Sequence, residues 1–136
     1  GRDRDDDARE DASPASPEQN LREVSMDCIF CKIVAGEIPS TKVYEDGLVY
    51  GFEDINPLAP VHVIVVPKEH HPTLNDLSDS ETWFSMLKAA QAIARIKGVD
   101  VSGYRVALNC GPDGTQIVMH LHMHVLGGRP LDGKLG

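Results

Sequence analysis

Three histidines near the C-terminal end of the sequence alternate with apolar residues. His120, His122 and His124 are separated by Leu121 and Met123. This period of two predicts a strand over 119–126 with one buried face and with the three imidazoles in a row on the other face. Imidazole is neutral and nucleophilic near pH 7, so the row indicates chemistry more than structural support.

The spacing of these histidines narrows the chemistry. Same-face residues of a strand lie roughly 6.6–6.8 Å apart, so neighbouring histidines could share a metal ion, whereas the outer pair, about 13 Å apart, could not. The row is better suited to supply a nucleophile and hydrogen-bond donors along an extended anion such as a polyphosphate. A metal-dependent hydrolase built on His62, His120 and His122 is the weaker alternative.

Other segments share a family resemblance with the histidine row. In chain order they are 28–33, 36–39, 44–46, 52–55, 60–62, 66–70, 103–105, Asn109 and 120–128. Together they resemble the histidine triad (HIT) superfamily, with order and spacing kept from about Met26 to Arg129. The branch that they resemble most is that of the histidine triad nucleotide-binding proteins.

The elements that would position the triad can be predicted from local patterns. They are a short helix over 27–35 capped by Asp27, strands over 42–45, 48–54 and 61–66, a long helix over 80–97 ended by Gly98, and strands over 103–109 and 119–126. Strands, one long helix and further strands indicate an α+β class with an antiparallel sheet. The resemblance implies the HIT fold, and a homodimer in which the sheet continues across both chains.

Composition separates a tail from a single domain. The sequence has 136 residues and a net charge of -8, and residues 1–25 hold eight acids and four arginines with few large apolar side chains. We therefore expect a disordered acidic tail over 1–25 and a HIT domain over 26–136. The charge argues against a nucleic-acid partner. No apolar run reaches the ~18–20 residues of a membrane span, and no signal core is present, so we expect a cytoplasmic protein without a membrane partner.

The resemblance implies an enzyme that cleaves purine nucleoside 5'-phosphoramidates through a covalent nucleotidyl-histidine intermediate. His122 would be the nucleophile, His62 and His124 would donate to the phosphate oxygens, and His120 would complete the triad. Such a histidine splits one difficult displacement into two easier steps. No cofactor is required for this catalysis.

The same resemblance implies the residues that hold the nucleotide. Asp54 would accept the ribose hydroxyls, and Asn109 matches a phosphate-site position. The others are apolar residues of a purine pocket and three residues of the loop before the triad: Ile29, Phe30, Ile33, Phe52, Ile55, Gln116, Ile117 and Val118. Plain core packing is the alternative for the apolar members.

The pair Cys28-x-x-Cys31 is a second candidate site. Two cysteines at this spacing indicate zinc only if two further ligands are found. Several branches of the family pair such cysteines with histidines at the positions of His70 and His120, which implies a structural zinc ion here. The alternative is two partly buried thiols and a surface histidine. A disulfide is not expected in a reducing compartment.

One residue departs from the pattern of the branch. Relatives have Ser after the Gln of the loop before the triad, where this chain has Ile117, which can donate neither a proton nor a hydrogen bond. Two alternatives therefore stay open beside the phosphoramidate hydrolase. One is a dinucleoside polyphosphate hydrolase that uses the same residues, and the other is a nucleotide-binding interaction module whose catalysis is vestigial.

Overall fold

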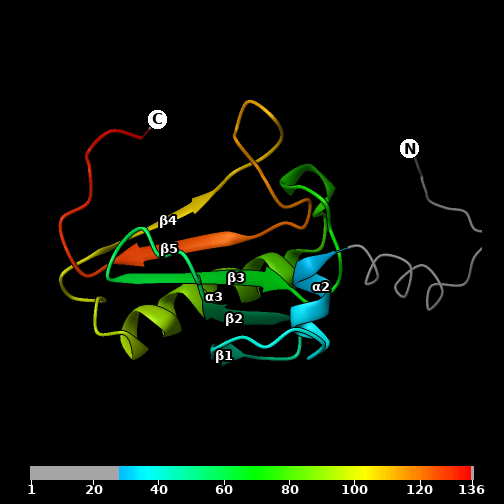
Figure 1. The fold of residues 1–136 in the computed structure, drawn as a ribbon, viewed down its shortest axis with the longest axis horizontal. Helices are drawn as coiled ribbons and strands as arrows, with labels where there is room; N and C mark the ends of the chain where they lie inside the picture. Colours follow the sequence, from blue (N-terminus) through cyan, green and yellow to red (C-terminus); the bar gives the residue numbers. More distant parts are fainter. Residues whose placement is uncertain (1–27, 136) are drawn as a thin grey trace, which may run out of the picture.

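The computed structural model describes residues 28–135 as one antiparallel sheet with a long helix on one face and a short helix at one end (Figure 1). The elements in chain order are α2 (Ile29–Val34), β1 (Lys42–Glu45), β2 (Val49–Glu53), β3 (Val61–Pro67), the 3-10 helix η1 (Leu74–Asp76), α3 (Ser80–Ile96), β4 (Tyr104–Leu108) and β5 (Met123–Gly127). The five strands are ordered β1-β2-β3-β5-β4, and every neighbouring pair is antiparallel. The α+β prediction is confirmed; the tail predicted over 1–25 lies outside the described residues.

The long helix α3 begins and ends as its sequence predicts, to within one residue. The Asp79 side chain accepts a hydrogen bond from the Glu81 amide at 3.1 Å, which caps the N-terminus. Gly98 follows the C-terminus with φ of 73°, a left-handed conformation that glycine adopts without strain. Its buried face packs against the sheet and holds the main core, with Met86 and Ile93 fully buried.

The sheet has two covered faces, and the candidate histidines lie on the one away from α3. Val63, Val65 and Val125 belong to the core cluster under α3. Strand side chains alternate between faces, so His62 and His124, with Ile64 paired opposite His124, lie on the other face. That face also carries α2, and all seven residues of β3 are buried between the two layers.

The prediction of one strand over 119–126 is wrong at its start, because β5 begins only at Met123. The residue paired with Met123 is Val65, so two more steps of pairing would reach Pro67, which has no N–H to donate. Without strand pairing before Met123, buried and exposed side chains also cease to alternate. His120, Leu121 and His122 are all buried, whereas the Met119 side chain, expected on the buried face, is 52% exposed.

The short helix also differs from its prediction. Helix α2 starts at Ile29, and its N-cap is Cys28, whose Sγ accepts a hydrogen bond from the Cys31 amide at 3.3 Å. The expected cap, Asp27, lies outside the described residues. Over 28–135 none of the helices is long and apolar enough to cross a membrane.

Candidate functional site

A cavity of about 560 Å³ opens on the face of the sheet opposite α3, a size usual for small-molecule sites. It lies between α2, the strands β2 and β3, and the loops 54–60 and 109–118. Twelve of the residues predicted for the site line it: Ile29, Phe30, Ile33, Phe52, Asp54, Ile55, His62, Asn109, Ile117, Val118, His122 and His124. The structure thus brings together residues that lie up to 95 positions apart in the sequence, from Ile29 to His124.

One wall of the cavity is buried, apolar and aromatic. Phe30 and Phe52 meet edge to face with ring centroids 5.6 Å apart, and Ile33 is buried with them. These three residues belong to the core and also line the cavity, so the purine-pocket role and the core-packing role are compatible. Ile55 and Ile117, in contrast, are 90% and 89% exposed, which excludes core packing as their role.

His62 and His124 form a pair whose proton positions follow from their partners. The Leu58 amide donates to His62 Nδ1 at 3.0 Å, so the proton of the neutral His62 ring sits on Nε2. This Nε2 lies 2.9 Å from His124 Nδ1 and 3.3 Å from Asp54 Oδ2. When His62 donates to His124 Nδ1, the His124 proton sits on Nε2, as a donor for a ligand in the cavity.

His122 has the opposite arrangement of proton and lone pair. Its Nδ1 lies 2.8 Å from the carbonyl oxygen of His120, which can only accept, so Nδ1 carries the proton and Nε2 the lone pair. The His122 ring lies 5.0 Å from the Phe30 ring and 5.0 Å from the His124 ring, between centroids. It therefore stands between the aromatic wall and the donor pair.

Burial keeps these rings neutral, as the proton assignments require. Desolvation lowers the pKa of His62, with Asp54 opposing the shift, and desolvation also lowers the pKa of His122. For His124, desolvation and then the neighbouring His122 and His62 lower the pKa to about 4. Near pH 7 the site thus offers a neutral nucleophile and neutral N–H donors.

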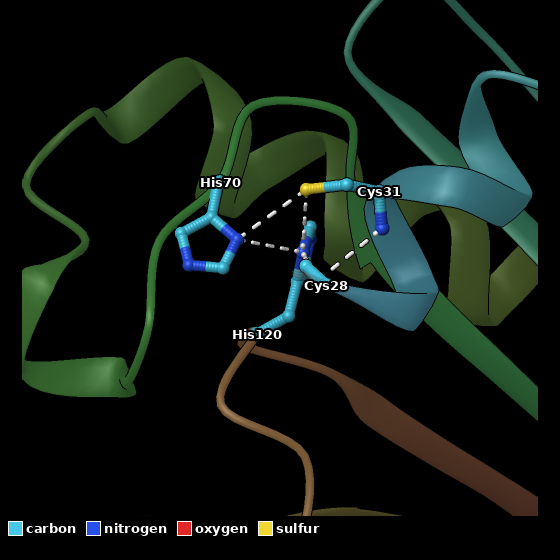
Figure 2. Close-up of side chains that lie close together, drawn as sticks. All are labelled: Cys28, Cys31, His70 and His120. Carbon is cyan, nitrogen blue, oxygen red and sulfur yellow. Dashed lines mark hydrogen bonds between the residues drawn. The ribbon is translucent and has the colours of Figure 1, made fainter. Parts of the chain in front are cut away.

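His120 belongs to a different cluster, with Cys28, Cys31 and His70 (Figure 2). Figure 2 shows these side chains pointing toward one another from α2, the segment after β3 and the segment before β5. His120 Nδ1 lies 3.2 Å from Cys28 Sγ, 3.5 Å from Cys31 Sγ and 3.2 Å from His70 Nδ1. Cys31 Sγ lies 3.4 Å from His70 Nδ1.

These four residues fit a tetrahedral zinc ion. Zinc bonds of ~2.3 Å to sulfur and ~2.0–2.1 Å to nitrogen place neighbouring ligand atoms about 3.3–3.8 Å apart, close to the distances in the cluster. His120 Nε2 donates to the Pro67 carbonyl at 2.9 Å, so the Nδ1 lone pair points into the cluster. Desolvation lowers the pKa of His70 and of His120 to about 4, which keeps both lone pairs available.

A second group of possible metal ligands, Asp54, His62 and His124, fits a metal less well. Their ligand atoms also lie within 4.8 Å of one another. However, the Leu58 amide occupies His62 Nδ1, so a proton and not a lone pair faces the group from Nε2. The alternative metal site on His62, His120 and His122 is not assembled either, because the three rings have different partners.

The structure places two predicted site residues away from the cavity. His120 contributes to the site only its carbonyl, which holds His122. Gln116 holds its own loop: its Nε2 donates to the carbonyls of Pro72 at 2.7 Å and Val118 at 2.9 Å, and its Oε1 accepts from the Gly111 amide at 2.9 Å.

Several residues that line the cavity were not predicted. They are Ile38, Pro39, Ser40, Glu53, Asn56, Leu58, Ile64 and Thr115. Ile38 and Pro39 lie within a segment that carries the family resemblance, so the sequence held a signal for them. Leu58 acts through its backbone amide, and a side-chain pattern has no signal for that.

Comparisons with known proteins agree with this geometry. The HIT domain family matches residues 35–131. The chain is 45% identical over 109 residues to the purine nucleoside phosphoramidase of Escherichia coli (strain K12), which covers 79% of this chain and 92% of that protein.

Two solved structures are similar. A HIT family hydrolase from Legionella pneumophila Philadelphia 1 has a TM-score of 0.78 at 43% identity, covering 81% of this chain and 100% of that one. A zinc-bound histidine triad family protein from Mycobacterium smegmatis has a TM-score of 0.71 at 38% identity, covering 80% of each chain. The family and the fold of this chain are therefore shared with proteins of known structure.

Proposed function

The chain belongs to the histidine triad (HIT) family, and we propose that it hydrolyses purine nucleoside 5'-phosphoramidates through a covalent intermediate on His122. The observation that carries this proposal is the bond from His122 Nδ1 to the His120 carbonyl. It leaves the lone pair on Nε2 of a neutral ring that lines the cavity beside an aromatic wall and a pair of donors.

The reaction proceeds in two displacements at phosphorus. The His122 Nε2 lone pair attacks phosphorus, the bond from phosphorus to the amine nitrogen breaks, and the amine leaves with the electron pair and takes up a proton from solvent. Water then attacks phosphorus and returns a proton to solvent, the bond to Nε2 breaks, and nucleoside monophosphate and neutral His122 result. The His124 Nε2–H donates to the phosphate oxygens, whose charge changes most in each step, while His62 holds His124 in place.

Different parts of the cavity hold the base, the ribose and the phosphate of the nucleotide. The purine lies against Phe30, Ile33 and Phe52, next to His122. Asp54 accepts the ribose hydroxyls, and Asn109 contacts the phosphate from the facing loop. Ile29, Ile55, Ile117 and Val118 complete the apolar lining, and Gln116 supports the loop from behind.

The charge of the cavity favours a phosphoramidate over a dinucleoside polyphosphate. Among the described residues that line it there is no Lys or Arg, while Glu53 and Asp54 are acidic and the histidines are neutral. Several phosphates in a row would be buried without opposite charge, which is costly. A single phosphate with an amine substituent carries much less negative charge and fits this lining better.

Turnover of two substrates tests the proposal. We expect kcat/KM for adenosine 5'-phosphoramidate to exceed that for diadenosine tetraphosphate, with no loss of activity in the assay when a chelator is added. A preference for the tetraphosphate would instead support the polyphosphate hydrolase. Tight binding of AMP without turnover of either substrate would support the interaction module.

We also propose that Cys28, Cys31, His70 and His120 hold a structural zinc ion. The fit of their distances supports this, as does the zinc-bound relative from Mycobacterium smegmatis. With every tetrahedral position filled by protein, the ion would cross-link three segments and supply no reaction step. Thiolate ligands need reducing conditions, which a cytoplasmic location supplies, and Cys28, Cys31 and Cys110 form no disulfide within residues 28–135. Elemental analysis should find about one zinc ion per chain. A finding of no zinc in protein that was never exposed to chelator would contradict the site.

A homodimer formed through α3 and β4 completes the proposal. Strand β4 is at the edge of the sheet, and apolar side chains there and on α3 are open to solvent, with Phe84 61% and Val106 39% exposed. A second copy related by a two-fold axis would cover both and pair the edge strands. Light scattering at micromolar concentration should give twice the chain mass; a monomer mass would contradict the dimer.

A further inference from the structure

The geometry points to Arg129 as a positioning residue for His62 and, through it, for the phosphate donor His124, acting through the backbone of Leu58. Its effect on turnover rests on the proposed function, but its effect on the histidines does not. Arg129 follows β5 and lies 71 positions after Leu58. Its guanidinium donates to the Leu58 carbonyl from Nη2 at 2.9 Å and to the Pro130 carbonyl from Nη1 at 3.0 Å.

Leu58 is held by its backbone and not by burial. It lies in the loop 54–60, which has no helix or strand, and its side chain is 71% exposed. Its amide donates to His62 Nδ1 at 3.0 Å, and its carbonyl accepts from Arg129. The guanidinium therefore fixes one side of the residue whose other side touches the catalytic histidine.

A separate contact ties the same two segments together. Gly128 has φ of 93°, and a Cβ added there would lie 2.9 Å from the Pro60 Cβ. Only glycine allows the end of β5 to approach the loop this closely. The loop is thus held against the segment that carries Arg129 at Pro60 as well as at Leu58.

The Leu58 amide decides which nitrogen of His62 carries the proton, and so what His124 offers the substrate. With the amide in place, the proton is on His62 Nε2, His124 Nδ1 accepts it, and His124 Nε2 is a donor. If Leu58 moves away, only Asp54 Oδ2, 3.3 Å from Nε2, still favours the proton there, so some His62 rings can place it on Nδ1, and in these molecules His124 donates from Nδ1. The His124 Nε2 would then present a lone pair to the phosphate oxygens, which repels them.

Arg105 provides a matched control. Its Nη2 donates to the carbonyl of Asp132 at 2.6 Å, which is the same kind of bond, from an arginine to a backbone carbonyl near the C-terminal end. Unlike Arg129, it makes no bond to the loop 54–60 among those recorded for residues 28–135. Arg105 lies in β4, so light scattering first checks that Arg105→Ala keeps the mass of the wild type; the variant then reports what loss of such a bond does to stability.

Nitrogen NMR of the histidine rings tests the positioning role directly, in the full chain as purified and without substrate. In the wild type and in Arg105→Ala we expect His62 to be in the Nε2–H form. In Arg129→Ala we expect a mixture of the two neutral forms at unchanged pH, with a melting temperature close to that of Arg105→Ala. A His62 spectrum that is unchanged in Arg129→Ala overturns the inference.

Single-turnover kinetics on adenosine 5'-phosphoramidate test the consequence. We expect Arg129→Ala to slow nucleotidyl transfer about tenfold to a hundredfold, as a small misplacement of catalytic groups does, with a smaller change in AMP affinity. Added guanidinium ion should restore part of the rate to Arg129→Ala, and none to Arg105→Ala. Equal rates in the two arginine variants overturn the inference. A wild type that turns over no phosphoramidate overturns the proposed function, while the NMR result still decides the role of Arg129.

Discussion

The molecule holds two histidine clusters whose ring protons point in opposite directions. In the cysteine–histidine cluster, His120 donates its proton outward to the Pro67 carbonyl and turns a lone pair inward. In the cavity, His62 accepts outward from the Leu58 amide and turns its proton inward. In both cases a backbone group on the outer nitrogen decides whether the imidazole can serve as a metal ligand or as a donor to an anion.

His122 lies between the two clusters and is connected to both. It donates to the His120 carbonyl, so its lone pair faces away from the metal cluster. The Phe30 ring lies 5.9 Å from the His120 ring and 5.0 Å from the His122 ring, between centroids, and forms a wall common to both clusters. In the proposed account the same residue type thus serves as ligand, nucleophile and donor within a few ångströms, according to its backbone partner.

Removing the lone pair of the nucleophile should have the largest effect. We expect His122→Asn to lower kcat on adenosine 5'-phosphoramidate by about 10³-fold or more, because the covalent step is lost, while AMP binding is kept. Steady-state assays and calorimetric titration with AMP measure the two quantities. Turnover within tenfold of the wild type would rule out His122 as the nucleophile.

Opening the metal cluster should cost stability. Cys31→Ser removes one of four ligands, so we expect loss of zinc and a fall in the free energy of unfolding on the order of 3 kcal/mol, because metal binding contributes to folding. Urea unfolding and elemental analysis measure both. Cys110→Ser is the matched control, since Cys110 is a free thiol outside the cluster. Equal midpoints for the two variants would mean that the cluster is not a metal centre.

A third change adds a hydrogen-bond donor to the cavity at Ile117. Ile117 is 89% exposed on the cavity rim and cannot protonate a leaving amine. We expect Ile117→Ser to raise kcat about tenfold for substrates with strongly basic amines, and little for those with acidic leaving groups. Ile117→Ala, which removes the side chain without adding a hydroxyl, should show no such selectivity. A uniform effect on both substrate classes would show that another group already protonates the amine.

Acid should have a smaller effect, exerted through the donor pair. Burial holds the pKa of His124 at about 4 in the folded chain, below its ordinary value of 6.5. Between these pH values the unfolded chain binds a proton that the folded chain does not, so stability is present above pH 6.5 and is lost as the pH falls toward 4. We expect His124→Asn to lose less stability than the wild type between pH 7.5 and 5, by about 1 kcal/mol. Parallel pH profiles in urea unfolding would contradict a neutral, partly buried His124.

Much of this arrangement could be predicted because it depends on local pattern or on motif. Helical spacing and the terminating Gly98 predict α3 to within one residue, and the β-branched run predicts β3. Cys28 and Cys31 lie one helical turn apart. The family resemblance predicted His70 and His120 as the other two ligands, and the structure places both next to the cysteines. In each case the residue type itself carries the information.

The rest depends on partners distant in the sequence. The alternation over 119–126 predicts a strand, but the ladder begins only at Met123, since Pro67 has no N–H to donate and the His120 side chain is held by the Pro67 carbonyl and by the cysteine–histidine cluster. The proton positions of His62 depend on the Leu58 backbone, and Leu58 in turn on Arg129. No periodicity or spacing reports a backbone amide that meets an imidazole, so these features needed the structure.

The stereochemistry at phosphorus tests the central claim, that reaction passes through a covalent bond to His122. An adenosine phosphoramidate made chiral at phosphorus with sulfur, and hydrolysed in water labelled with heavy oxygen, reports the number of displacements whether or not an intermediate accumulates. Two successive in-line displacements, one by His122 and one by water, predict retention of configuration in the product. Inversion would mean that water attacks the substrate directly, and would contradict the account.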